Sequence, residues 1–330
     1  MLIRLLVMLL AVVALATNTF AQDSNSETNQ AARIAKRFEK KQTYELRYKL
    51  KPGDKIDFLF EQVASTKTRM SGEEENTTSR SQTAKQWEVK NVDSLGNMTF
   101  ALKWISVNMW QQIGDDEPIK YNSKTDTKVP DEYQTIAQFV GETIAVFSIE
   151  KNGKIIGRVS DLSESSFGAG EVTVPLPSKP VSLGHSWYVP TVMNATDETA
   201  KHIRLKARIN YQLSKVENNN AFITFRTEVL TPIKSEKIRS TIMQQMTDGY
   251  IVFDIERGYP IKRHVEWDEK AQGFEGADSF LTYVGRATEK VQRSSDQATK
   301  QLSSTLSPLV AKRPKQVDLR THDAKPMTKK

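Results

Sequence analysis

Apolar and polar residues alternate along much of the chain, and this period of two predicts β-strands. The clearest pair of strands is WEVKNV (87–92) and, after a short turn, MTFALKWISVNM (98–109). Within the second strand the apolar face changes side between Trp104 and Ile105. Because a period of two cannot change side without an extra residue, we expect a β-bulge there.

Further strands are expected over 44–50, 56–63 and 279–291, whereas SGEEENTTS (71–79) reads as a flexible loop tip and 112–130 as a long polar connection. The spacing of apolar residues predicts a short helix over 131–140, ended by Gly141. Ser235 is of the residue type that caps a helix N-terminus, so a second helix is expected to follow it.

Two stretches have nearly the same sequence: VFSIEKNGKIIGR (146–158), with a tight turn at Asn152-Gly153, and VFDIERGYPIKR (252–263). A strand pair and a helix precede each predicted hairpin, in the same order. Two explanations are open: two hairpins that converged on a common turn pattern, and an internal duplication of one β-rich unit. The shared order of elements favours duplication.

The predicted fold is therefore a β-dominated α+β fold. Curved antiparallel sheets form a barrel or a half-barrel from two tandem repeats, and one helix per repeat covers them. The expected segments are a signal peptide (1–21), a polar, partly helical segment (22–43), repeat 1 (44–162), a linker (163–180), repeat 2 with a closing strand (181–292) and a disordered basic tail (293–330).

The first residues predict export. Arg4 precedes an apolar run over 5–16, and small residues end at Ala21, so cleavage is expected between Ala21 and Gln22. The run is shorter than the roughly 20 residues of a membrane-spanning helix, although an uncleaved anchor is the alternative. The mature chain is expected in the periplasm or outside the cell, without a transmembrane span.

Composition excludes several classes of chemistry. The chain has no cysteine, which excludes disulfides, thiol catalysis and cysteine-bound metals. Of its net charge of +7, Arg4 supplies +1 and residues 293–330 supply +6 (nine Lys or Arg against three Asp), so 7 − 1 − 6 leaves residues 22–292 neutral. Nucleic-acid binding is therefore not expected, while the basic tail could contact an anionic envelope surface.

The chain also resembles an uncharacterised family of exported bacterial proteins. The resemblance rests on YELRYKLKPGD (44–54), WEVKNVDSLGN (87–97), YNSKTD (121–126), VPLP with the later GHSW (174–187) and YIVFDIE (250–256), and it covers about Tyr44 to Lys290. It implies an exported, β-rich fold and supplies no catalytic residues.

No catalytic, metal or cofactor site is expected. The four histidines, His185, His202, His264 and His322, are scattered, and His264 with Glu266 lacks the cysteine motif of the zinc deaminases that share the H-x-E spacing. The acidic residues at 115–117 lack EF-hand spacing. We therefore expect a protein that is not an enzyme.

Trp104, Met109 and Trp110 are the candidate ligand-binding residues. They could form the wall of an apolar pocket, and ordinary core packing is the alternative. The predicted function is a non-enzymatic exported protein that holds a lipophilic ligand between the curved sheet and its helices. The alternative is a structural or adaptor protein of the cell envelope, and a hydrolase that uses acidic residues is the weakest hypothesis.

Overall fold

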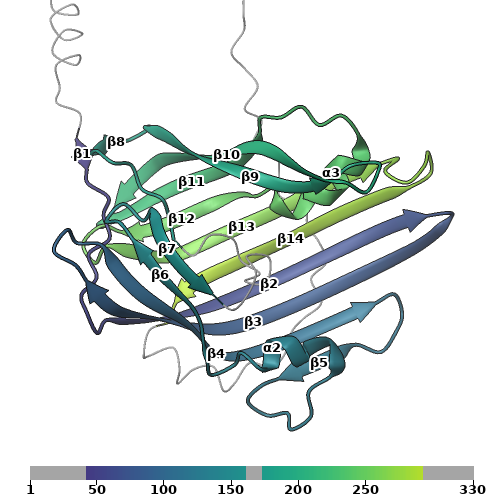
Figure 1. Ribbon diagram of the computed structural model, residues 1–330, viewed down its shortest axis with the longest axis horizontal. Coiled ribbons are helices and arrows are strands. Elements are labelled where there is room, and N and C mark those ends of the chain that lie inside the picture. Colours follow the sequence, from purple (N-terminus) through teal and green to yellow (C-terminus); the bar gives the residue numbers. More distant parts are fainter. Residues whose placement is uncertain (1–41, 161–172, 293–330) are drawn as a thin grey trace, which may run out of the picture.

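The computed structural model describes residues 42–160 and 173–292, most of which form one 12-stranded antiparallel sheet (Figure 1). The first half contributes β2 (Lys55–Met70), β3 (Glu73–Val92), β4 (Met98–Ile113), β5 (Ile119–Asn122), β6 (Thr143–Ile149) and β7 (Ile155–Ser160). The second contributes β9 (Ser186–Thr196), β10 (His202–Glu217), β11 (Asn220–Val229), β12 (Asp248–Asp254), β13 (Tyr259–Gln272) and β14 (Phe280–Val291). The predicted signal peptide and basic tail lie outside the described residues.

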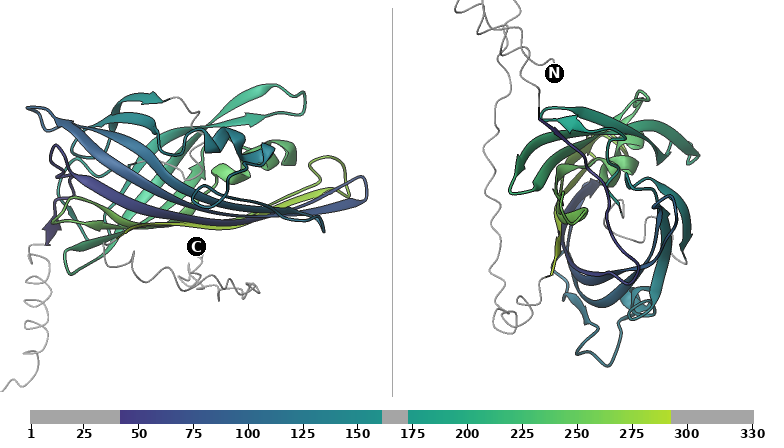
Figure 2. Two further views of the ribbon diagram at one scale, coloured as in Figure 1. Left: turned by 90° about the horizontal axis from the view of Figure 1, so that it is seen from below. Right: turned by 90° about the vertical axis from the view of Figure 1, so that its left-hand side faces the viewer.

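The sheet is curved and open. Its order is β7-β6-β4-β3-β2-β14-β13-β12-β11-β10-β9, with β5 paired to β4, so within the described residues β7 and β9 are its two edges. Seen along its length, the sheet curls around a common interior (Figure 2). The predicted β-dominated, curved antiparallel fold is confirmed. The alternative prediction of a closed barrel is wrong, because the edge strands β7 and β9 do not pair with each other.

The two halves share an order of elements, which is three long strands, a helical segment and a hairpin, while the short β5 is additional in the first half and β14 in the second. Corresponding turns precede β2 and β9: Gly53 N–H donates to Val89 O (2.9 Å), and Gly184 N–H donates to Leu213 O (2.8 Å). The predicted closing strand is β14, which pairs with both β2 and β13 and joins the halves into one sheet. Duplication itself stays a prediction.

The predicted bulge lies in β4. Ala84 of β3 pairs with Ser106 and the next residue, Lys85, pairs with Trp104, so Ile105 has no opposite partner on β3. Ile105 is 42% exposed, whereas the side chains on either side of the bulge are buried. The extra residue keeps the apolar side chains on the concave face along the whole strand.

The segment expected as a flexible tip at 71–79 is mostly strand. The turn contains only Ser71 and Gly72, and β2 and β3 pair without interruption from Met70 and Glu73 inward. Glu74 of β3 forms ion pairs with Lys67 (2.8 Å) and Arg69 of β2. These cross-strand ion pairs stabilise the polar end of the β2–β3 pair, which extends beyond the apolar core. Similarly, β5 lies within the connection expected to be irregular at 112–130.

Residues 44–50 were expected to form a strand, and their burial alternates as predicted, with Leu46, Tyr48 and Leu50 buried. Only Thr43–Tyr44 is a strand, β1, which pairs with β8 (Val181–Ser182). The backbone that follows bonds to hairpin turns instead: Tyr48 N–H donates to Lys151 O (2.8 Å). This segment therefore closes one end of the curved sheet.

The described part of the expected linker belongs to the core. Val174 and Leu176 are buried, and Val174 N–H donates to the Tyr48 hydroxyl (2.8 Å). At Gly153, which has a φ of +82°, a Cβ would lie 2.3 Å from Val174 O. The Asn152-Gly153 turn predicted from the sequence therefore also needs glycine for this close approach.

Two short helical segments lie on the same side of the sheet (Figure 2). The first is η1 (Asp131–Tyr133) followed by α2 (Gln134–Ala137), and the second is α3 (Glu236–Ile242) followed by η3 (Met243–Gln245). The predicted helix at 131–140 is thus shorter and begins as a 3-10 turn, while Ser235 caps α3 as predicted. Among the described residues, none of the helices has the length and apolarity needed to cross a membrane.

Candidate functional site

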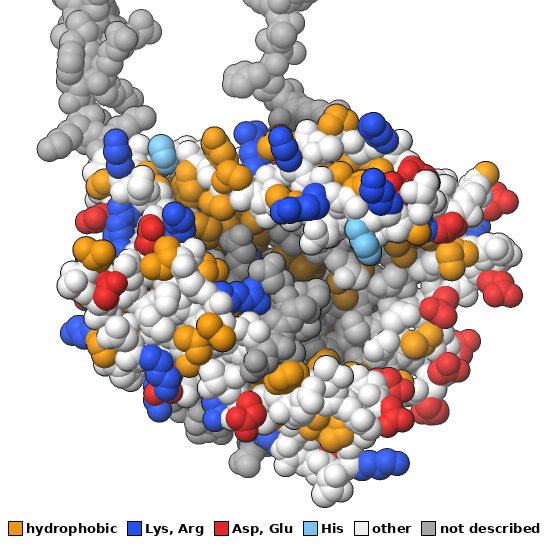
Figure 3. Space-filling model, viewed as in Figure 1, with side chains coloured by type: hydrophobic (Ala, Val, Ile, Leu, Met, Phe, Trp, Pro, Cys, Tyr) orange, Lys and Arg blue, Asp and Glu red, His pale blue; other side chains and the backbone are white. Residues whose placement is uncertain are grey.

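The concave side of the molecule is hollowed between the strands β9 and β10 and the strands β4 and β5 (Figure 3). A cavity of about 230 Å³ lies on this side, between the η1–α2 segment and the inner faces of β2, β3 and β4. Its apolar and aromatic lining residues are Phe60, Trp104, Val107, Met109, Trp110, Tyr133 and Ile136. This volume exceeds the roughly 150 Å³ of an apolar cavity that binds benzene in another protein.

The three sequence-predicted residues all border this cavity. Trp104 is 6% exposed, and Met109 packs against the main core. Trp110 follows Met109 directly in β4, so its side chain projects from the opposite face of the strand. There the Arg80 guanidinium lies 4.9 Å from the Trp110 ring centre. The inward wall is therefore formed by Trp104 and Met109, while Trp110 contributes to the rim.

The other walls of the cavity are polar. Alternate residues of β3 place Ser79, Ser81 and Thr83 along one side, and the amides of Gln62 and Gln111 flank them from β2 and β4. Gln62 also hydrogen-bonds the hydroxyl of Tyr283, and burial raises the pKa of that hydroxyl. The cavity is amphipathic, with a hydroxyl-bearing strand facing aromatic and aliphatic side chains.

A buried ion pair lies at the inner end of the polar strand. The Lys85 Nζ lies 3.2 Å from a carboxylate oxygen of Glu289 on β14, and the two side chains are 8% and 20% exposed. The same ammonium lies 4.3 Å from the ring centre of Phe60. Lys85 is thus held by an opposite charge and an aromatic face, as a buried cation requires.

The indole of Trp104 lies beside this pair, because Trp104 and Lys85 are direct cross-strand partners. Its Nε1–H is buried and has no hydrogen-bond partner among the described residues. A buried donor without an acceptor costs about 1–3 kcal/mol relative to a satisfied one.

The cover of the cavity is held mainly at its N-terminal end. Tyr133 is buried, which raises the pKa of its hydroxyl, and its ring stacks on Tyr121 of β5 with centres 6.2 Å apart. Its hydroxyl donates to Ile119 O (3.4 Å). At the other end, Gly141 N–H donates to Trp104 O (2.8 Å). No side-chain cap bond is present at the start of η1 or α2.

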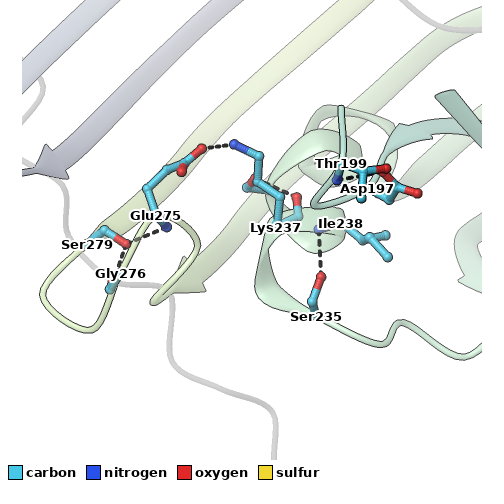
Figure 4. A network of polar contacts seen from close by, with 9 residues as sticks. Asp197, Thr199, Ser235, Lys237, Ile238, Glu275, Gly276 and Ser279 are labelled. Carbon is cyan, nitrogen blue, oxygen red and sulfur yellow. Dashed lines mark hydrogen bonds and ion pairs between the residues drawn. The ribbon is translucent and has the colours of Figure 1, made fainter. Parts of the chain in front are cut away.

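The second helix is held more firmly. The Ser235 hydroxyl accepts a hydrogen bond from Ile238 N–H (3.3 Å), and Lys237 pairs with Glu275 of the β13–β14 loop (Figure 4). Ile238 and Ile242 are buried in a separate apolar cluster under α3, whose other buried members are Met193, Ala195, Leu205 and Ala207. The side chains under α3 therefore form a buried apolar cluster.

The three histidines within the described residues do not form a common site. His264 bonds Thr288 (2.9 Å) and Glu266 (2.9 Å), and the His185 ring stacks on Trp187 with centres 6.5 Å apart. Across the parts of the chain that the structure describes, no group of three His, Asp or Glu side chains is placed to hold a metal ion.

Lys85 and Phe60 also line the site, and neither was predicted from the sequence. Lys85 falls in register with Thr83, Trp87 and Val89, all on the buried face of β3. A lysine at an inward position of an alternating strand is the signal that was available. Its partner Glu289 lies about two hundred residues away in the sequence, and nothing local indicates that they meet.

No protein-family profile and no curated protein matches the chain. Among solved structures, lipovitellin, in a study of lipid–protein interactions, is similar with a TM-score of 0.44 and 11% identity, over 74% of this chain and 26% of that one. The chain thus spans about a quarter of lipovitellin. The translocator domain of the autotransporter NalP from Neisseria meningitidis is similar with a TM-score of 0.28 and 6% identity, over 81% and 95% of the chains. At these scores neither similarity supports a statement about function.

Proposed function

We propose that the protein is an exported, non-enzymatic binding protein that holds one small lipophilic ligand in the cavity between η1–α2 and the inner sheet face. The observation that carries this proposal is the cavity of about 230 Å³ with Phe60, Trp104 and Met109 in its wall. Pockets for drug-sized ligands usually measure about 300–1,000 Å³. A ligand of about ten non-hydrogen atoms, or one short chain of a larger lipid, suits this smaller space.

The cover offers an entry route. Its α-helical part is only the four residues Gln134–Ala137 and has no side-chain cap, so opening it breaks few hydrogen bonds. Ile136 and Tyr133 would then close over the ligand, removing apolar surface from water at about 25 cal/mol per Å². Binding therefore requires only local movement of the cover, and the sheet stays intact.

Native mass spectrometry of residues 22–330, purified from the protein's own export pathway without detergent, tests the proposal. We expect a mass excess that denaturation removes, with a lipophile in the organic extract. The variant Ile136→Trp, which fills the cavity, should lose the excess, while Val159→Trp at a site 73% exposed should keep it. An apo mass for the wild type, together with no saturable uptake of an apolar probe, would refute the proposal.

A second function, an adaptor in the cell envelope, is favoured by the edge strand β9. Tyr188 and Val192 are 61% and 43% exposed there, and among the described residues no strand pairs with the outer side of β9. Exposed edge strands with apolar side chains are common sites of strand addition. A photo-crosslinker at Tyr188 should then give one discrete adduct in intact cells, and the same group at the exposed Leu95 should give none.

A further inference from the structure

We infer that the outer face of β9 and β10 is a docking surface for a membrane that contains anionic lipids. The surface, called here the β9–β10 face, comprises Tyr188, Val192, Arg204, Lys206 and Leu230. This inference goes beyond the ligand-binding proposal and does not depend on it, because none of these residues lines the cavity. It follows from the exposure, the charge and the free edge of these strands.

The first feature is a set of exposed apolar side chains. Met193 of β9 lies in the apolar cluster under α3, whereas Tyr188 and Val192 project from the opposite side of the strand and are 61% and 43% exposed. Leu230, which directly follows β11, is 50% exposed, and its N–H donates to Lys206 O (2.8 Å). Exposed apolar side chains thus lie on both sides of β10, as at a surface that contacts an apolar partner.

The second feature is a pair of cations on the same face. Arg204 and Lys206 are exposed on β10, and Lys206 is the cross-strand partner of Val192. Within residues 42–160 and 173–292, neither side chain forms an ion pair or a hydrogen bond. The next cation along β10, Arg208, is paired with Glu228 of β11 (2.8 Å). Arg204 and Lys206 therefore remain available to an anionic partner.

The other charges around this face cancel. At the β9–β10 turn and beside it, Asp197 interacts with Lys201 and Glu198 with Lys234. With histidine counted as neutral, the face therefore has a formal net charge of +2, although residues 22–292 are neutral overall. Figure 3 shows Lys and Arg side chains together with apolar ones over β9 and β10.

This combination matches the head-group region of an anionic bilayer. Lipid phosphates would face Arg204 and Lys206, since basic side chains near such a surface are attracted to it. Tyr188 would lie at the level of the head groups, where tyrosine is enriched, and Val192 and Leu230 would reach the boundary of the acyl chains.

The competing partner is a peptide strand added to the free edge of β9. Pro190 lies in the middle of β9 and has no N–H, and the pairing with β10 continues on both sides of it. Proline within a sheet is tolerated where its nitrogen faces a free edge, so an added strand would lack one hydrogen bond there. Together with the two unpaired cations, this favours a bilayer over a strand.

Flotation of residues 22–330 with vesicles tests the inference. We expect the protein to bind vesicles of equal parts phosphatidylcholine and phosphatidylglycerol, and not phosphatidylcholine alone. Arg204→Gln combined with Lys206→Gln should weaken this binding about thirtyfold. The matched control, Lys120→Gln combined with Lys124→Gln, removes two exposed cations around β5 and should change it less than about threefold. Because the predicted basic tail is the same in all these proteins, it cannot produce the difference.

A second readout keeps the test decisive if the double variant does not fold. The chain has no cysteine, so Tyr188→Cys can carry a single polarity-sensitive nitrobenzoxadiazole label. Anionic vesicles should shift its emission to shorter wavelength, while the same label at Leu95→Cys, a site 75% exposed between β3 and β4, should not respond.

Unchanged emission at position 188 while the protein floats with the vesicles would overturn the inference, because the face would then not touch the lipid. Equal binding by the wild type and the variant without Arg204 and Lys206 would overturn it as well. A shift caused by envelope proteins and not by lipid vesicles would assign the face to strand addition instead. None of these results bears on the lipophile in the cavity, so the proposed function is tested separately.

Discussion

The two helices that cover the concave face occupy corresponding places in the two halves, yet one packs on a buried apolar cluster and the other borders a cavity. Under α3, Ile242 is fully buried and Ile238 is 5% exposed, both within one apolar cluster. Under η1–α2, Ile136 is only partly buried and lines open space. The same order of strands and helix is therefore compatible with a purely structural core and with a binding site.

The difference begins in the local sequence. Ser235 caps α3, whose seven residues form one continuous α-helix. Its apolar residues Ile238 and Ile242 are four positions apart and lie on the buried face of the helix. The first helix follows Pro130, starts as a 3-10 turn, and reaches only four α-helical residues. A shorter helix places fewer side chains over the sheet, and Trp104 and Tyr133 both line the cavity that remains.

The largest expected effect contrasts the two covers directly. Ile242→Ala removes a fully buried side chain from the cluster under α3 and should lower the free energy of unfolding by about 2–5 kcal/mol. Ile136→Ala enlarges a space that is already open and should cost less than about 1 kcal/mol. Urea unfolding of both variants measures this, and equal losses would show that the two covers are packed alike.

A smaller effect concerns the helix cap. Ser235→Ala removes the acceptor for Ile238 N–H and should lower the free energy of unfolding by about 1 kcal/mol. It should also raise the pKa of Glu198, because the Ser235 hydroxyl is the main group that lowers it. Ser240→Ala within the same helix is the matched control and should be close to neutral. A neutral Ser235→Ala would mean that packing alone fixes α3.

The smallest effect depends on pH. Burial raises the pKa of Glu269 on β13, and Arg239 of α3 offsets this only in part. The pKa of Glu269 in the folded state therefore lies above its unfolded value of about 4.3. As the pH rises through the range between these two pKa values, the free energy of unfolding falls, and it stays lower at higher pH. Glu269→Gln should therefore melt at a slightly higher temperature than wild type at pH 7, and at the same temperature near pH 3. The exposed Glu132→Gln should show no such difference, and a destabilised Glu269→Gln at pH 7 would contradict the account.

Local signals predicted the parts of the fold that local chemistry controls. The bulge at Ile105, the Asn152-Gly153 turn and the cap at Ser235 each follow from residues adjacent in sequence, and the structure confirms all three. The strand character of residues 73–79 was missed because it arises from pairing with β2 and cross-strand ion pairs, which composition does not reveal.

The site was only partly predictable for the same reason. Trp104 and Met109 stand out as large side chains in an alternating strand, and the structure places both at the cavity. That a cavity exists depends on how η1–α2 sits over β3 and β4, which periodicity does not specify. The pairing of Lys85 with Glu289 depends on β14 lying beside β2, a long-range contact between the two halves.

The central claim is that the lipophile occupies the space under η1–α2 and not the region under α3. Crystals grown with methyl 8-bromooctanoate, recorded at the bromine absorption edge, test this directly. The account predicts one anomalous peak between Ile136 and the inner face of β3 and β4, and none under α3. A peak only under α3, or only at the outer edge of β9, would contradict it.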